Sequence, residues 1–100
     1  MYEHIVVFRF NSELSEAQEE DLLQQLRSFK DRIPGIVSMS AGKNVTHETQ
    51  NVHGFTMGLR ITFANREALL AYGPHPAHQA FVRSLDGLLD QVVVADYEIL

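Results

Sequence analysis

The segment around residue 75 holds the side chains best suited to moving a proton. Tyr72, His75 and His78 follow one another at intervals of three residues, and Pro76 lies between the two histidines. An imidazole changes its charge near neutral pH, so His78 is a candidate general base for a proton next to a carbonyl group. The neutral phenol of Tyr72 can donate a hydrogen bond to the enolate oxygen that then forms. The alternative is that both are packing groups at a corner between two helices.

A metal site in the same segment has less support. His75 and His78 can share one helical face and could hold a divalent ion, but no third ligand is evident. Because His75 directly precedes Pro76, it is better suited to closing a loop and beginning a helix. We therefore expect no metal site and no cofactor.

Two further polar residues lie in apolar segments. His4 would need a hydrogen-bonding partner if buried, so it is either a pocket group or a structural histidine. Arg60 could bind an anionic ligand, but an ion pair with Asp96 or Glu98 on a neighbouring strand is the favoured explanation.

Hydrophobic periodicity divides the chain into the elements that must position these groups. The first helix begins at a capping box of Ser15 and Gln18 and ends at Gly35. A short helix capped by Asn65 runs to Tyr72, and a third begins at Pro76 and carries apolar residues as far as Leu89. Alternating or apolar runs predict four strands, at residues 4–10, 36–45, 55–63 and 92–99.

This order is β-α-β-β-α-(α)-β, which predicts an α+β, ferredoxin-like fold with a four-stranded antiparallel sheet and helices on one face. A chain of 100 residues corresponds to a single domain, residues 1–100. The uncovered sheet face would present Val6, Phe8 and Phe10 or their alternates to water. We expect a second copy to cover that face in a homodimer.

Charge and composition limit the classes of partner and the cellular compartment that we expect for this chain. Eight scattered basic residues against thirteen acidic ones give a net charge of -5, which disfavours nucleic acid. The chain has no cysteine, and its longest unbroken apolar run, residues 68–72, is too short for a membrane span. We expect a cytoplasmic protein with no membrane partner.

Several segments, in this order and spacing, resemble the stress-responsive α/β-barrel (Dabb) family. The resemblance covers residues 4–97 and implies a ferredoxin-like protomer whose sheet packs on that of a second protomer, forming a dimeric α/β barrel. It is carried by His4-Ile5-Val6-Val7-Phe8-Arg9-Phe10, Ile33-Pro34-Gly35-Ile36, Gly54-Phe55-Thr56, Phe63 to Leu69, Tyr72 with His75-Pro76-Ala77-His78, and Val94 to Tyr97.

The family includes stress-induced proteins, an antimicrobial protein and a cyclase that closes an aromatic ring by aldol condensation of a linear polyketide. In that cyclase the acting tyrosine and histidine correspond to Tyr72 and His78, and a first-strand pocket histidine corresponds to His4. Met57 stands where the cyclase has a strand histidine, so its substrate is not carried over. The candidates are therefore Tyr72 and His78 as catalytic residues, with His4, Phe8, Met57 and His75 lining the pocket.

Three functions remain open at this point. The first is a stress-response-type dimeric barrel that binds a small, partly apolar molecule. Its enzymatic alternative is a cyclase-like or lyase-like enzyme that uses His78 as a base and Tyr72 as a hydrogen-bond donor. The second is a non-catalytic structural stress protein. The third is a heme-free monooxygenase-like activity, as found in other dimeric ferredoxin-like barrels. The residues do not decide whether the chain is an enzyme.

Overall fold

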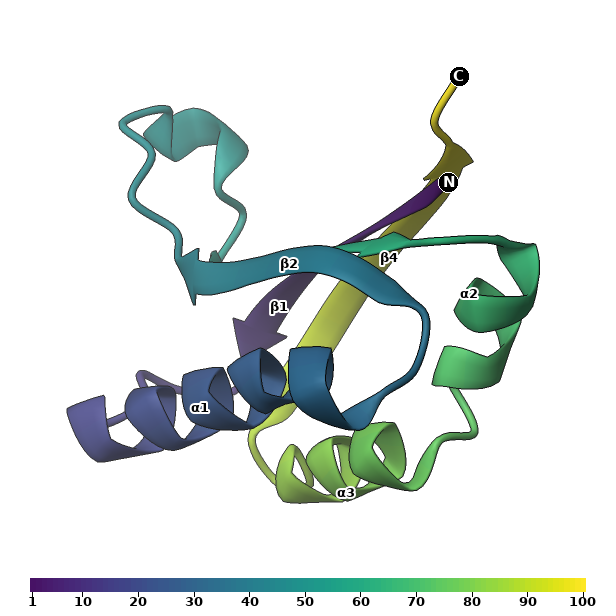
Figure 1. The fold of residues 1–100 in the computed structure, drawn as a ribbon. Helices are drawn as coiled ribbons and strands as arrows, with labels where there is room; N and C mark the ends of the chain where they lie inside the picture. Colours follow the sequence, from purple (N-terminus) through teal and green to yellow (C-terminus); the bar gives the residue numbers. More distant parts are fainter.

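One antiparallel sheet of four strands carries the three α-helices on a single face in the computed structural model, which describes residues 1–100 (Figure 1). The strands lie in the order β2-β3-β1-β4 across the sheet. This is the ferredoxin-like arrangement that the sequence predicts. The elements in chain order are β1 (Tyr2–Phe10), α1 (Glu16–Arg32), β2 (Ile36–Lys43), the 3-10 helix η1 (Thr49–Asn51), β3 (Phe55–Phe63), α2 (Arg66–Tyr72), α3 (Pro76–Ser84) and β4 (Leu89–Glu98).

The helices begin at the residues that the sequence predicts. At the start of α1, the Ser15 hydroxyl accepts from the Gln18 backbone N–H, and the Gln18 side chain accepts from the Ser15 N–H. Asn65 caps α2 in the same way through the Ala68 N–H. Each cap satisfies a backbone donor that has no partner inside its helix. No helix is both long and apolar enough to cross a lipid bilayer.

The core lies between the sheet and the helices. The helix-facing side of β1 contributes Val6 and Phe8, while its other side presents Ile5 and Val7. The uncovered sheet face therefore presents the β1 residues that alternate with Val6 and Phe8. Phe10 packs against the core. From α1 the core receives Leu22, Leu23, Leu26 and Phe29, and Ile33, the residue that follows the helix, extends this apolar stripe.

The last helix is shorter than the sequence predicts. An apolar pattern extends to Leu89, but α3 ends at Ser84 and Leu89 already begins β4. The cause is the turn between them, where Gly87 adopts a left-handed backbone conformation with φ of 78°. Leu89 therefore pairs with Phe10 as a strand residue. Smaller differences affect β1, which begins at Tyr2, and β2, which ends at Lys43.

The polar segment between β2 and β3 forms an excursion that projects away from the sheet (Figure 1). It joins two neighbouring antiparallel strands and contains η1. His47 and His53 are both exposed within it. These two histidines therefore lie outside the core.

Candidate functional site

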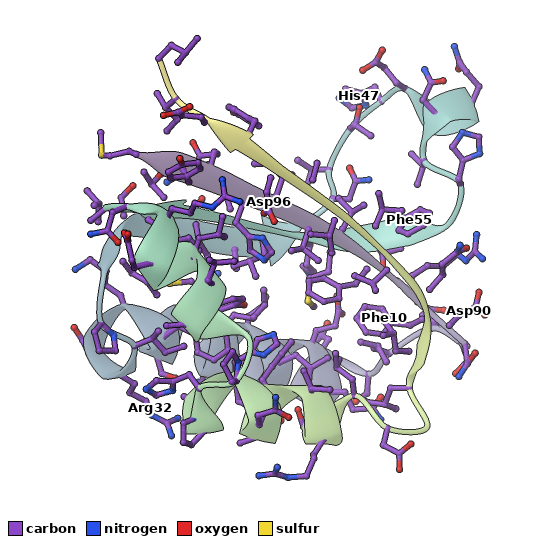
Figure 2. The ribbon with its side chains drawn as sticks, turned by 90° about the vertical axis from the view of Figure 1, so that its right-hand side faces the viewer. Phe10, Arg32, His47, Phe55, Asp90 and Asp96 are labelled. Carbon is purple, nitrogen blue, oxygen red and sulfur yellow. The ribbon has the colours of Figure 1, made fainter.

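A cavity of about 480 Å³ lies between the helix-facing side of β1 and β4 and the α2–α3 pair. Its polar side chains are His4, Tyr72, His78 and Asp96. Asp96 pairs with His4 across the two strands and so lies on the helix-facing side of β4 (Figure 2). The remaining lining residues are Val6, Phe8, Leu59, Leu69, Leu70, Gly73, Phe81, Val82, Leu85, Leu89, Val92 and Val94. The cavity is thus an apolar chamber with a few polar groups.

A hydrogen bond fixes the state of His78. Its Nδ1 lies 2.9 Å from the Gly73 carbonyl oxygen, which can only accept, so Nδ1 carries the proton and Nε2 has the lone pair. Burial lowers the pKa of His78 below its usual 6.5, the Gly73 bond opposes this change, and the charge of nearby His4 adds to it. At neutral pH the ring is therefore uncharged, with Nε2 as a proton acceptor.

Tyr72 lies between the two histidines. Its ring centroid is 4.4 Å from that of His78 and 5.2 Å from that of His4, and its side chain is buried. Burial, followed by the negative charge of Asp96, raises the pKa of Tyr72 well above its ordinary value of 10. The phenol therefore stays neutral and able to donate a hydrogen bond.

His4 and Asp96 form a pair beside these rings. The Nδ1 of His4 lies 2.5 Å from Oδ1 of Asp96. His4 is buried, whereas the Asp96 side chain is 41% exposed. The carboxylate accepts a hydrogen bond from Nδ1–H of His4 and thereby orients the imidazole. Asp96 is absent from the site that the sequence predicts; the antiparallel register of β1 and β4 is the signal that would have identified it.

Arg60 has a different partner from the predicted one. Its Nη1 lies 3.3 Å from Oε1 of Glu3 and 2.8 Å from Oγ1 of Thr62. Arg60 is opposite Ile5, whereas Asp96 is opposite His4, so the two side chains lie on opposite faces of the sheet. The predicted pairing with Asp96 or Glu98 is therefore wrong.

The structure places the remaining predicted pocket residues in different surroundings. Phe8 lines the cavity, but Met57 and His75 are not among its lining residues. Met57 is 2% exposed in the core opposite Phe8. His75 caps α3, because its Nδ1 accepts the Ala77 N–H at 3.0 Å. Met57 therefore packs in the core and borders a separate hollow beside β2, whereas His75 acts as a helix cap. No group of three or more His, Asp or Glu side chains is arranged to hold a metal ion.

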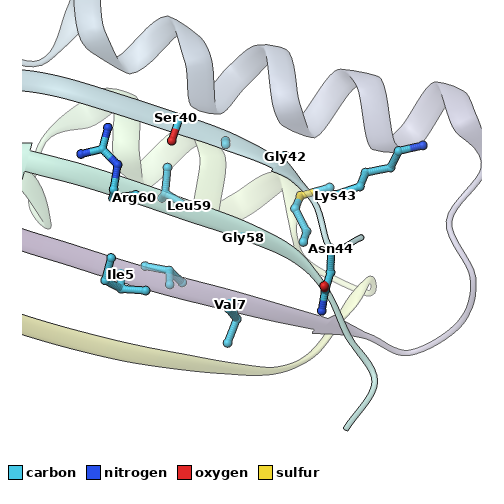
Figure 3. Close-up of a pocket in the computed structure, with 12 residues that line it drawn as sticks. Ile5, Val7, Ser40, Gly42, Lys43, Asn44, Gly58, Leu59 and Arg60 are labelled. Carbon is cyan, nitrogen blue, oxygen red and sulfur yellow. The ribbon is translucent and has the colours of Figure 1, made fainter. Parts of the chain in front are cut away.

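A second hollow, of about 550 Å³, lies on the sheet face away from the helices (Figure 3). Figure 3 shows Ile5 and Val7 of β1 beside Gly58 and Arg60 of β3. We call this surface the outer face; on β4 it includes Val93, which pairs with Val7. Its two apolar β1 residues lie next to the Arg60 and Glu3 pair, so the outer face mixes apolar and charged groups.

Two curated relatives cover most of this chain. Olivetolic acid cyclase of Cannabis sativa is 29% identical over 94 residues, which are 94% of this chain and 92% of the cyclase. The stress-response A/B barrel domain-containing protein HS1 of Arabidopsis thaliana is 32% identical over 96 residues, 95% of this chain and 86% of that protein.

Solved structures have the same fold. A crystal structure of an Arabidopsis thaliana protein has a TM-score of 0.87 and 29% identity, and the match covers all of this chain and 96% of that one. A dimeric ferredoxin-like protein of Thermobifida fusca has a TM-score of 0.84 at 20% identity, over 98% and 90% of the two chains. The family model of the stress responsive A/B barrel domain matches residues 2–99. A match over nearly the whole length, on a fold that these structures share, shows that this chain belongs to the stress responsive A/B barrel domain (Dabb) family.

Proposed function

We propose that this chain binds a small, partly apolar molecule in the cavity between β4 and the α2–α3 pair. The size of the cavity, about 480 Å³, is within the range of small-molecule sites. Its few polar side chains lie close to Tyr72 and His78, and the rest of the lining is apolar. Small-molecule sites usually have this composition, in which a few polar groups orient one end of the ligand.

The observation that favours an enzymatic form of this function is the hydrogen bond from His78 to the Gly73 carbonyl oxygen. It leaves Nε2 as a base in a ring that is neutral at physiological pH. The bound compound is then a carbonyl compound. His78 Nε2 takes a proton from the carbon next to the carbonyl group, and the electron pair of the broken C–H bond forms the enolate. The Tyr72 hydroxyl donates a hydrogen bond to the enolate oxygen.

The second half of such a reaction restores the base. The enolate carbon either takes a proton back or forms a bond to a second carbonyl carbon, whose oxygen receives the proton from His78. The first outcome is proton exchange and the second is an aldol-type condensation. Both outcomes are redox-neutral, so neither requires a cofactor. The hydrogen-bonded pair of His4 and Asp96 lies beside Tyr72 and His78 and adds two further polar groups to this part of the cavity.

Exchange of hydrogen for deuterium tests this proposal directly. We expect the chain to accelerate exchange next to the carbonyl group of methyl hexyl ketone in D₂O, measured by proton NMR. The variant H78A should lose about 10²-fold or more of that acceleration, the usual contribution of a general base. H47A is the matched control, because His47 is exposed in the excursion and lies outside the cavity. Ketone binding without accelerated exchange would contradict the enzymatic form and favour a binding or structural protein.

We also propose that the chain forms a homodimer through its outer face. Ile5 and Val7 are only half-buried there, and Val93 is 50% exposed. Burying such residues against a second copy removes apolar surface from water. The similar Thermobifida fusca protein is dimeric, which supports the proposal.

A further inference from the structure

Two glycines lie side by side on the outer face. Gly42 of β2 pairs with Gly58 of β3, and Val7 of β1 lies on the other side of Gly58 (Figure 3). Both glycines line the hollow of about 550 Å³. Because neither has a side chain, the surface of the sheet is lowered at this pair, which we call the glycine hollow.

The protomer itself shows no need for glycine at these two positions. Neither residue has a positive φ, unlike three other glycines of the chain. A Cβ at Gly42 would meet no atom within 4 Å, and one at Gly58 would meet only the Val6 carbonyl oxygen at 3.9 Å, an ordinary contact. Glycine weakens a strand, because it loses more backbone freedom on folding and has no side chain to pack. The pair therefore marks a place where a group from outside the protomer approaches the sheet.

The same row of the sheet is raised on its other half. Across the four strands the row runs Gly42, Gly58, Val7 and Val93. Val7 is half-buried and Val93 is 50% exposed, so both valines can be reached from outside. One half of the row is therefore a hollow and the other half is an apolar ridge.

A two-fold axis can match these two halves. The same surface meets itself in a two-fold dimer, so each ridge needs a hollow on the same face. An axis that runs along the strands, between β3 and β1, lays β1 and β4 of each copy over β3 and β2 of the other. Side chains of sheets packed face to face interdigitate, and the hollow gives the valines that space.

The charged groups near this row are paired within the protomer. Arg60 Nη1 lies 3.3 Å from Glu3 Oε1, and Arg9 Nε lies 2.7 Å from Asp90 Oδ2. These pairs involve opposite ends of β1, on either side of Val7. A second copy can therefore approach the row without strong repulsion between like charges.

We propose that the glycine hollow receives two valines of a second copy, with the partner's Val7 against Gly58 and the partner's Val93 against Gly42. The two-fold axis makes each contact twice. This inference rests on the proposed homodimer and adds the register in which the two sheets meet. Apolar burial favours the contact, and the absence of side chains in the hollow allows it.

Filling the hollow tests the proposal. We expect G58V and G42V each to raise the dissociation constant of the dimer at least about tenfold, because the added side chain excludes the partner's valine. Analytical ultracentrifugation over a concentration series measures this constant. Far-UV circular dichroism should show both variants folded, since the protomer has room for the added atoms. The control Q50V adds a valine at an exposed residue of η1, outside the sheet, and should leave the constant unchanged.

Compensating variants identify which valine fills which part of the hollow. We expect V7A to restore dimerisation when it is added to G58V, and V93A to restore it when added to G42V. The exchanged combinations, V93A with G58V and V7A with G42V, should give no rescue. Rescue only by the exchanged combinations, or no rescue at all, would contradict this register.

The remaining outcomes separate this inference from the homodimer on which it rests. An unchanged dissociation constant in G58V and G42V would overturn the inference and leave the homodimer standing, with the hollow open to water or a small ligand. Loss of the fold in both variants would contradict the premise that the protomer has room there. A monomeric native chain would overturn the homodimer and this inference with it.

Discussion

At position 78 a hydrogen bond decides which nitrogen can act as a base. His78 donates Nδ1–H to Gly73, the residue that directly follows α2, while the ring packs beside Tyr72. Backbone and side chain are thus coupled, because the end of α2 orients the imidazole carried by α3. A histidine without this bond would interconvert between its two tautomers and present Nε2 as a base only part of the time.

The pH dependence of proton exchange follows from the environment of His78. Burial lowers its pKa, so the base becomes protonated only below the usual value of 6.5. We expect the exchange rate constant to be level through neutral pH and to fall as the pH drops through that lowered pKa. An NMR titration of the His78 ring should give the same midpoint as the rate profile. A rate that declines with a midpoint above 6.5 would mean that another group is the base.

At the scale of the elements, the turn between α1 and β2 depends on a glycine that packs against α2. Gly35 has φ of 87°, and a Cβ built there would overlap the Cβ of Ala68. The turn also holds the end of β3, because the Gly35 carbonyl accepts the Ala64 N–H at 2.9 Å. Three elements thus meet at one residue, and α2 carries Tyr72 into the site.

We predict that G35A lowers the free energy of unfolding by roughly 2 kcal/mol or more, since backbone strain and a steric clash add. G87A is the matched control. Gly87 also has a positive φ, of 78°, but a Cβ there would meet nothing within 4 Å. Its expected loss is therefore about 1 kcal/mol, from strain alone. Urea denaturation measures both changes, and equal losses would show that the contact with Ala68 is unimportant.

At the scale of the whole molecule, the two faces of β4 serve the two proposed functions, ligand binding on one side and dimerisation on the other. Val92 and Val94 face the cavity, whereas Val93 between them belongs to the outer face. Strand alternation therefore lets adjacent substitutions test ligand binding and dimerisation separately.

We predict that V93D shifts the chain from dimer to monomer, because a carboxylate would be buried in the interface without a partner. The control V92D carries the same change on the opposite face and should remain dimeric. Light scattering at micromolar concentration measures both masses. A monomeric native chain, or a dimeric V93D, would contradict an interface on the outer face.

The sequence determines most of the fold and only part of the candidate site. Caps at Ser15 and Asn65 and alternation through β3 are local signals, so they specify the elements and their order without knowledge of their packing. Tyr72 and His78 are found in the same way, because they share one short segment of two consecutive helices. The family resemblance supplies the fold from the same residues.

The tertiary structure alone decides the face of each strand and the partner of each charge. Both sides of β1 are apolar, so only the position of the helices selects Val6 over Ile5 for the core. The pairing of His4 with Asp96, 92 residues away, depends on the register of two strands that are distant in sequence. Alternation fixes which residues share a face, but long-range packing chooses which face becomes the wall of a cavity.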